Sequence, residues 1–147
     1  MGSFAQGETQ ADDILIQRRG TLKNNKNIVG QSHHLNQDAA FRDVIPTKEG
    51  VAIKLEGNIF TDIGSQHYNA HKSMEEFWSQ YRNGGELYGL KPEMAQYNKA
   101  LYESLQNAGL SKEQSIQAMR EAVRQQLDYR LTSKMNVPRI PGRINLK

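Results

Sequence analysis

Apolar residues recur every three or four positions through the second half of the chain, and this spacing predicts three helices. They cover about 65–82, 92–109 and 111–131. Pro92 suits a first helical turn, and the sequence from Ser111 has the pattern of a capping box. The last two helices are expected to support the rest of the fold.

Each predicted helix has one stripe of residues expected to face the interior. The stripes comprise His67, His71, Met74 and Trp78, then Met94, Tyr97, Leu101 and Leu105, and finally Ile116, Met119, Val123 and Leu127. Aromatic residues on such faces usually belong to the packed support and do not stack on a ligand. We assign this role to Trp78, Tyr97, Tyr102 and Tyr129.

The first half of the chain has shorter patterns. The sequence at 51–56 alternates as in a strand, and it follows a short helix predicted over 38–45 that Pro46 ends. The segment 28–37 is predicted as a turn or strand end. Together these elements predict an α+β fold that is mostly α.

The two ends of the chain lack such patterns. Residues 1–27 are rich in glycine, asparagine and charge, and they predict a flexible leader with one short strand near 14–16. Residues 132–147 contain prolines that forbid helix, and they predict an extended basic tail. The organised domain is expected over 28–131, with its core at about 30–89 and supporting helices over 90–131.

Composition limits the kinds of site that the chain can hold. Its 147 residues suit one domain, and no apolar stretch reaches the roughly 18 residues of a membrane-spanning helix, so no membrane partner is expected. The start of the chain also lacks the pattern of a signal peptide. Without cysteine, any metal must be held by imidazole, carboxylate, amide or water. The apolar fraction of 37% is low, which suggests that a metal or partner adds stability.

The net charge of +3 is unevenly distributed. Residues 14–37 contain four cations and no acid, and residues 131–147 contain four cations and no acid. Both segments suit contact with phosphate, although basic composition alone favours solvated flexible ends.

All four histidines of the chain occur in two pairs. His67 and His71 are one helical turn apart, and side chains at this spacing have Cβ atoms about 5 to 6 Å apart, so two imidazoles can share one metal ion. An isolated pair of this kind is more often an ordinary feature of a helix surface. The adjacent His33 and His34 change this interpretation, because neighbouring residues of an extended segment point to opposite sides. One imidazole can then bind metal while the other acts as a base.

Asn58 lies between the predicted strand and the first long helix. Its amide is expected either to tie down the loop as a turn residue or to orient the base imidazole.

This order of elements and motifs resembles the ββα-metal finger of the HNH/endonuclease VII superfamily. The Ser-His-His sequence at 32–34 is similar to the signature of the SHH branch of nuclease toxins, which form the C-terminal tips of Rhs-type bacterial polymorphic toxins. The interval of nine residues from Asn58 to His67 is similar to that of the DNA-cleaving colicins. The resemblance covers about 30–89 and implies a small ββα-metal finger followed by two helices.

The resemblance implies a metal-dependent endonuclease that hydrolyses DNA with little sequence preference and uses one divalent ion, Mg, Mn or Zn. The interval from His34 to Asn58 is longer than in the colicin finger, a departure that bears on the role of Asn58. Other members of the superfamily bind metal through an aspartate or asparagine, so the resemblance keeps Asp38 and Asn58 as alternative ligands. The roles of His33 and His34 are open to exchange. The implied ligands are His33, His67 and His71, the implied base is His34, and the residue implied to orient it is Asn58.

The resemblance also implies a biological setting. Such a toxin is released from a larger secreted protein, acts in the cytoplasm of a rival bacterium, and is neutralised in the producer by a cognate immunity protein, expected to be acidic. On the DNA, contacts with backbone phosphate are expected to dominate. The predicted phosphate contacts are Arg18, Arg19, Lys23, Lys26, Lys72 and Arg82.

Two other classes of function are compatible with the histidines. One is a noncatalytic nucleic-acid-binding or protein-interaction module in which four histidines close around a structural zinc ion. The other is a zinc peptidase, which the sequence disfavours because position 68 is tyrosine where the HExxH motif has glutamate. Metal-dependent DNA nicking separates the nuclease from both.

Overall fold

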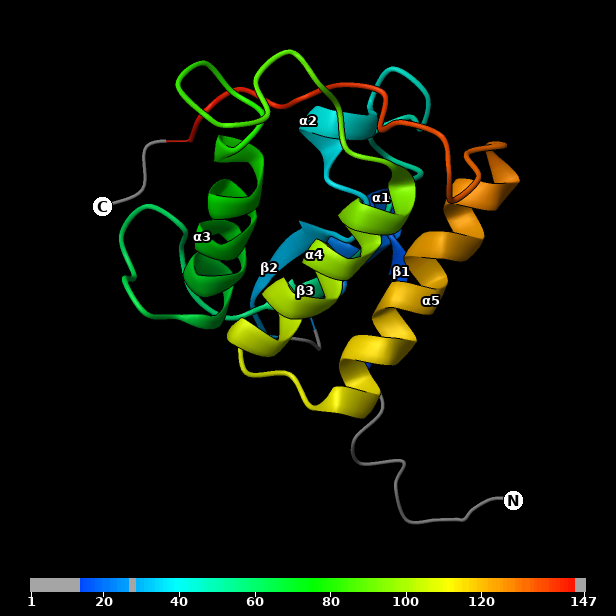
Figure 1. Ribbon diagram of the computed structural model, residues 1–147. Coiled ribbons are helices and arrows are strands. Elements are labelled where there is room, and N and C mark those ends of the chain that lie inside the picture. The colour runs from blue at the N-terminus through cyan, green and yellow to red at the C-terminus, as the bar shows by residue number, and fades with distance from the viewer. Residues whose placement is uncertain (1–13, 27–28, 145–147) are drawn as a thin grey trace.

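The computed structural model describes residues 14–26 and 29–144 (Figure 1). Its described part is an α+β fold with a three-stranded antiparallel sheet and five helices. The elements in chain order are β1 (Gln17–Arg18), α1 (Arg19–Leu22), β2 (Gln31–His34), α2 (Asp38–Phe41), β3 (Val51–Leu55), α3 (Gln66–Ser79), α4 (Met94–Asn107) and α5 (Lys112–Asp128).

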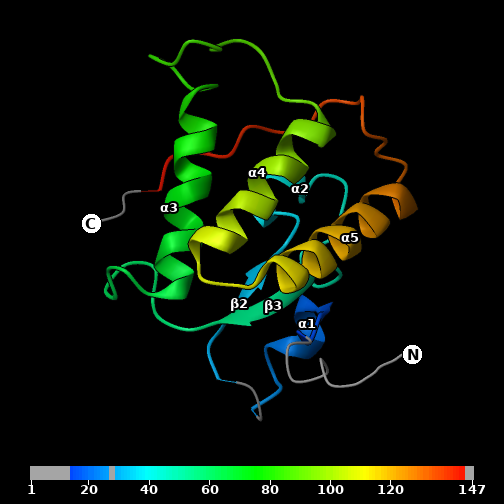
Figure 2. The ribbon, with the colours of Figure 1, turned by 60° about the horizontal axis from the view of Figure 1, so that its bottom comes forward.

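The sheet has β3 in the middle, with β1 and β2 on either side of it. The register pairs His33 with Ile53 and His34 with Ala52. Paired residues of neighbouring strands point to the same face of a sheet, so His33 and His34 lie on opposite faces. Figure 2 shows the long helices α3, α4 and α5 over one face and α1 on the other.

The long helices form a layer in which α4 packs against both α3 and α5. The predicted stripe of α4 is buried, and so are Met74 and Trp78 of α3, which confirms this part of the prediction. Met74 is 4% exposed and Trp78 is fully buried. The core therefore lies between the helical layer and the sheet.

Hydrogen bonds join this layer to the segment that follows the adjacent histidines. Trp78 Nε1 donates to Gln37 Oε1 at 2.7 Å, and the Tyr97 hydroxyl donates to the Leu35 carbonyl at 2.6 Å. The same hydroxyl accepts from Gln37 N at 2.8 Å. The end of β2 is thus fixed by both α3 and α4.

The predicted buried face of α5 is wrong. Leu127 is 54% exposed, and the other three residues of the predicted stripe are only partly buried. The interior face is rotated toward small and amide-bearing residues because neighbouring elements present polar groups that the amides of α5 satisfy. Its buried residues are Ser115, Ala118, Ala122, Gln125 and Gln126.

Two glutamines on that face satisfy buried polar groups of other elements. Gln126 Nε2 donates to Asn36 Oδ1 and to Asn98 Oδ1, each at 2.7 Å. Gln125 Oε1 accepts from Val51 N at 3.0 Å, and its Nε2 donates to the Glu49 carbonyl at 2.7 Å. These bonds connect α5 to the segment after β2, to α4 and to the start of β3. Each buried polar group needs such a partner.

The N-terminal segment differs from the predicted flexible leader. Residues 17–22 form β1 and α1, and Leu22 is fully buried. Ile14–Ile16, predicted as a strand, lies just before β1 and has no strand structure. Residues 1–13 of the predicted leader lie outside the described residues.

The C-terminal segment is extended, as its prolines predicted, but it is packed on the domain. Val137 is 1% exposed, and its N–H donates to the Pro92 carbonyl at 2.9 Å. Arg139 forms an ion pair with Asp43 at 2.7 Å. The segment therefore crosses the entry to α4 as part of the fold.

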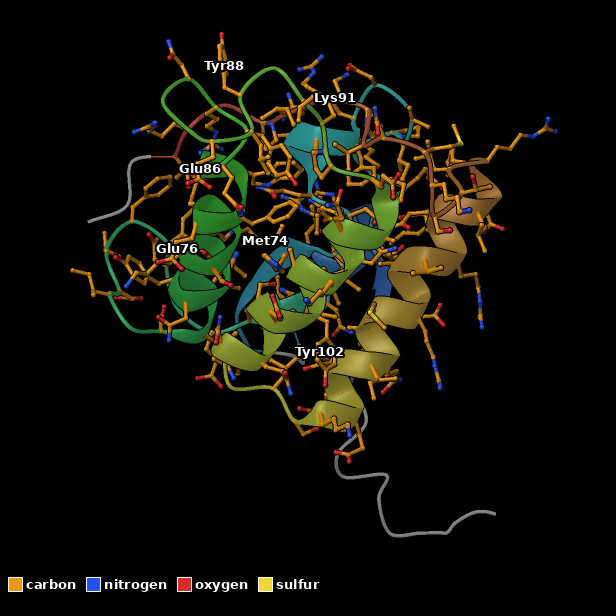
Figure 3. All side chains as sticks on the ribbon, in the orientation of Figure 1. Met74, Glu76, Glu86, Tyr88, Lys91 and Tyr102 are labelled. Carbon is orange, nitrogen blue, oxygen red and sulfur yellow. The ribbon has the colours of Figure 1, made fainter. Side chains whose placement is uncertain are left out.

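The loop between α3 and α4 carries Tyr88 and Lys91 on the outside of the molecule (Figure 3). Within the described ranges, every helix is too short or too polar to cross a membrane.

Candidate metal centre

The site begins with the end of β2, which brings two imidazoles to the sheet in consecutive positions. His33 is 5% exposed and faces the helical layer, while His34 is half-buried on the opposite face. The sequence prediction that neighbouring histidines diverge is therefore met by the register of β2 with β3.

The second pair of histidines comes from the first turns of α3. Ser65 caps this helix, since its side chain accepts from Tyr68 N. His67 N donates to the Glu56 carbonyl at 2.9 Å, which holds the start of α3 against the end of β3. One turn later, His71 extends from the same side of the helix.

Three of the four imidazoles converge. The centroid of the His33 ring lies 5.2 Å from that of His67 and 5.1 Å from that of His71, and the last two are 4.9 Å apart. Each ring offers one nitrogen, and these three nitrogens all lie within 4.8 Å of one another. Three imidazoles at this separation could hold one metal ion.

Gln31 fixes the orientation of one of these rings. Its Oε1 lies 2.9 Å from His67 Nδ1. An amide oxygen can only accept, so neutral His67 carries its proton on Nδ1 and leaves the lone pair of Nε2 free. Histidine ligands of metals are commonly held by a hydrogen bond of this kind.

His33 presents a polar atom that the described residues do not satisfy. Its Nδ1 is buried and has no hydrogen-bond partner among them. Burial lowers the pKa of His33 well below 6.5, with further lowering from His71 and His67. A buried nitrogen that stays neutral and unpaired is suited to a metal ligand.

The pKa values of the other two imidazoles are lowered as well. Burial lowers the pKa of His71 to about 4, helped by His67 and opposed by Glu75. Burial also lowers the pKa of His67, opposed by a hydrogen bond with the backbone of Gly57. All three imidazoles are therefore neutral near pH 7, which is the form that binds metal. The donor set fits a divalent ion that accepts nitrogen ligands.

His34 is held apart from this cluster by the segment before β3. Its Nε2 lies 2.9 Å from the Thr47 carbonyl, so in the neutral ring Nε2 carries the proton and Nδ1 has the lone pair. Thr47 Oγ1 donates to Asp38 Oδ1 at 2.7 Å, which fixes the position of that carbonyl. A Cβ atom at Gly50 would meet His34 Cδ2 at 2.6 Å, so glycine leaves room for the ring.

Asn58 lies in the loop that leads to α3, and its contacts are those of a turn residue. Its Oδ1 accepts from Phe60 N at 2.8 Å and from Thr61 N at 3.2 Å. Its own N–H donates to Asp62 Oδ2 at 2.9 Å. The contacts of Asn58 therefore tie down the loop. His34 is hydrogen-bonded to the Thr47 carbonyl, not to Asn58.

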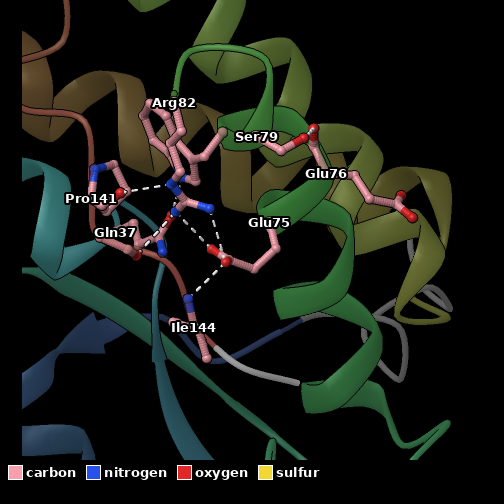
Figure 4. Close-up of polar contacts among 9 residues, drawn as sticks. Gln37, Glu75, Glu76, Ser79, Arg82, Pro141 and Ile144 are labelled. Carbon is pink, nitrogen blue, oxygen red and sulfur yellow. Dashed lines mark hydrogen bonds and ion pairs between the residues drawn. The ribbon is translucent and has the colours of Figure 1, made fainter. Parts of the chain in front are cut away.

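Two of the cations predicted to contact phosphate have protein partners. Arg82 donates to both Glu75 oxygens at 3.0 Å and to the Pro141 and Gly142 carbonyls, also at 3.0 Å (Figure 4). Its side chain is 11% exposed, so it ties α3 to the C-terminal segment and offers little surface to DNA. Arg18 pairs with Glu49 at 2.8 Å but remains 63% exposed. Because the guanidinium of Arg82 is nearly buried and bonded to protein groups, the prediction that Arg82 contacts phosphate is corrected.

The other predicted cations are accessible. Lys72 is exposed on α3, and Lys26 is exposed after α1. Arg19 and Lys23 line a groove beside the histidine cluster, together with Lys54. Lys54 was not among the predicted contacts.

Sequence reasoning missed the residues that hold the imidazoles, chiefly Gln31 and Thr47. The signal for Gln31 was its position two residues before His33, which puts both side chains on one face of a strand. Thr47 had no such signal, because its carbonyl reaches His34 only through the turn before β3.

Comparisons of the chain with protein-family models, with curated proteins and with solved structures find no match.

Proposed function

We propose that the chain is a metal-dependent endonuclease that hydrolyses DNA phosphodiester bonds with little sequence preference. The observation that carries this proposal is the convergence of His33, His67 and His71 from a strand and a helix. His34 follows His33 in the chain, faces the other side of the sheet and is fixed separately. Three ligands leave a metal ion with open coordination positions, which a closed structural site lacks.

The arrangement of β2, β3 and α3 supports the likeness to the ββα-metal finger of the HNH/endonuclease VII superfamily. A strand ends in the two adjacent histidines, an antiparallel strand follows, and the next helix carries the other two. A bound divalent ion, Mg, Mn or Zn, would stabilise negative charge on the phosphate and the leaving oxygen. His33, His67 and His71 are the residues proposed to hold it.

His34 is the proposed general base. The Thr47 carbonyl accepts from Nε2, which leaves Nδ1 to take a proton from water. The water oxygen then bonds to phosphorus as the bond to the 3′ oxygen breaks, and this oxygen takes a proton from solvent. The products are a 5′ phosphate and a 3′ hydroxyl.

The likeness to the SHH branch extends the proposal to a setting. The chain is then the toxic part of a larger secreted protein used between bacteria, and an acidic immunity protein covers its basic surface in the producer. Expression of the chain from a tightly repressed promoter should kill the host, and His34→Ala should remove this toxicity. Equal toxicity of the two forms would contradict the proposed setting.

Plasmid nicking tests the activity directly. The purified chain is incubated with supercoiled DNA in EDTA and with added magnesium, manganese or zinc, alongside His34→Ala, His71→Ala and the surface control Lys99→Ala. Nicking should need metal, should be retained by Lys99→Ala, and should be lost in both histidine variants.

Metal binding measured by calorimetry separates the two histidine roles. His34→Ala should still bind metal, whereas His71→Ala should not. Zinc binding without nicking under any metal would favour the noncatalytic module and overturn the nuclease proposal.

A further inference from the structure

An open groove of about 440 Å³ lies beside the histidine cluster. It is formed by α1, the start of β2, β3 and the start of α3, so residues distant in the sequence meet there. We call it the basic groove, and its lining includes Arg19, Lys23, Gln31, Ser32, Lys54 and His67.

The basic groove carries positive charge that the described part of the chain does not neutralise. Its three cations are Arg19, Lys23 and Lys54, and no carboxylate lines it. Every ion pair among the described residues uses a different cation, such as Arg18 with Glu49 nearby. Cations gathered around one hollow without an acid attract an anion.

A buried hydroxyl adds a hydrogen-bonding group to the same wall. Ser32 Oγ is buried and has no partner among the residues that the structure describes. Ser32 is paired with Lys54 across β2 and β3, so both side chains lie on one face of the sheet. Arg19 of α1 and Lys23, which follows that helix, border the groove beside this pair. A phosphate oxygen accepts hydrogen bonds from hydroxyl, ammonium and guanidinium groups alike.

The groove adjoins the candidate metal centre at one residue of the cluster, His67. Gln31 and His67 line it, and these two residues are bonded to each other at 2.9 Å. An anion in the groove therefore lies next to a proposed metal ligand. A nucleic acid strand has phosphates at regular intervals, and one occupying the metal centre would place a neighbour close by.

We propose that the basic groove binds a phosphate of the DNA backbone adjacent to the one that is cleaved. Arg19, Lys23 and Lys54 neutralise this phosphate, and Ser32 Oγ donates a hydrogen bond to it. The inference rests on the proposed nuclease function and deepens it, because it assigns the side from which the strand reaches the metal centre. Contacts of this kind position the backbone without reading sequence.

DNA binding in EDTA tests the groove without any cleavage. Anisotropy of a labelled 20-base-pair duplex is followed across a series of salt concentrations for the complete chain and for two triple variants. The groove variant should bind more weakly, and its plot of log affinity against log salt should be shallower by about 0.9 for each lost contact. The groove variant is Arg19→Ala, Lys23→Ala and Lys54→Ala, and the control with equal charge loss is Lys99→Ala, Lys112→Ala and Arg120→Ala.

A second variant removes the hydroxyl without changing charge. Ser32→Ala should bind the duplex several-fold more weakly and leave the salt slope unchanged. Thermal unfolding of each variant shows whether it is folded, and a misfolded triple variant is replaced by the single changes. Equal losses of DNA affinity in the groove and control variants would overturn the proposal that the basic groove binds phosphate. So would the absence of salt-dependent DNA binding by the unmodified chain. Groove-dependent binding by a chain that nicks no plasmid would instead contradict the nuclease function.

Discussion

The hydrogen bond from His67 Nδ1 to Gln31 leads to a test of metal affinity at a residue that is not itself a proposed ligand. Gln31→Ala frees the His67 ring to rotate and to exchange tautomers, so metal affinity should fall about 10- to 100-fold. Gln31→Glu keeps an acceptor at this position and should retain most of the affinity. Calorimetric titration with zinc measures both. An unchanged affinity in Gln31→Ala would show that the ring is held by other means.

Gly50 controls the space for the proposed base. A methyl group there would meet His34 Cδ2 at 2.6 Å and Nε2 at 3.1 Å, so Gly50→Ala should displace the ring. A displacement of about 1 Å can cost about 100-fold in rate, while metal affinity should stay the same. Gly20→Ala is the control, because its new methyl meets Lys48 atoms at an ordinary 3.4 Å. Equal nicking rates in the two variants would argue against His34 as the base.

The histidines themselves were predictable from sequence because the helix and strand periods dictate where they point. His67 and His71 share a helix face at any register, and His33 and His34 diverge in any strand. Their supports were harder to predict because they depend on tertiary contacts. Thr47 contacts His34 through its carbonyl, which every residue has, so the residue type at 47 carries no signal.

At the scale of elements, α5 shows how an apolar pattern can mislead. Its aliphatic residues gave a regular stripe, yet the helix buries alanines and two glutamines. Amide side chains can replace apolar ones in an interior where other elements present unpaired polar groups. Those groups lie on β3, on α4 and after β2, and a helix pattern read alone does not include them.

Replacement of Gln126 should therefore destabilise the fold far more than replacement of its neighbour. Gln126→Ala leaves Asn36 and Asn98 without a shared partner, which should cost about 1 to 3 kcal/mol for each buried group. Leu127→Ala, at a residue 54% exposed, should change stability by less than about 0.5 kcal/mol. Urea unfolding compares the two. A larger loss of stability in Leu127→Ala than in Gln126→Ala would indicate that the apolar stripe is the interior face of α5 after all.

The pairing of α3 with the C-terminal segment gives a test that separates stability from DNA binding. Arg82→Ala leaves Glu75 without its ion-pair partner at an 11–13% exposed site, although Ile144 N still donates to it, and this should cost about 3 kcal/mol. DNA affinity in EDTA, measured below the unfolding temperature, should be unchanged because the guanidinium has protein partners. Weaker binding with unchanged stability would reinstate Arg82 as a phosphate contact.

For the whole molecule, the three converging imidazoles link stability to pH. The unfolded chain takes up protons at the ordinary histidine pKa of 6.5, whereas burial lowers the pKa of His71 in the folded chain to about 4 and lowers those of His33 and His67. Between these values the unfolded state binds more protons, so acid favours unfolding. In EDTA, the free energy of unfolding should be greatest above pH 6.5 and fall as the pH drops toward 4.

Urea titrations across this pH range measure the effect. His71→Asn should make the free energy of unfolding depend less steeply on pH, because one of the three imidazoles with a lowered pKa is removed. An identical slope in the variant would mean that carboxylates dominate the acid sensitivity. Added zinc should raise the urea concentration at the midpoint of unfolding at neutral pH. In acid it should have no such effect, because protonated imidazoles do not bind metal.

The N-terminal part shows the limit of composition as a guide to the whole domain. Residues 1–27 are rich in glycine, asparagine and charge, and this composition predicted a flexible leader, yet residues 17–22 form β1 and α1. The buried Leu22 and two backbone hydrogen bonds, from Arg19 N to the Gly50 carbonyl and from Gly20 N to the Lys48 carbonyl, seat α1 on the sheet. The cations around Leu22 then border the basic groove. The ordered unit is larger than predicted because short elements gain their stability from the surface on which they pack.

The chain has four histidines, three of them in the cluster and the fourth, His34, on the opposite face of the sheet, and one tryptophan, which lies in the core on α3. Imidazole resonances in a nuclear magnetic resonance spectrum would thus all arise from the three proposed ligands and the proposed base, without assignment of a larger set. Emission from Trp78 would report unfolding of the helix that carries two of the proposed ligands. One sample therefore contains separate native probes for ion uptake and for loss of structure, with no dye or engineered label.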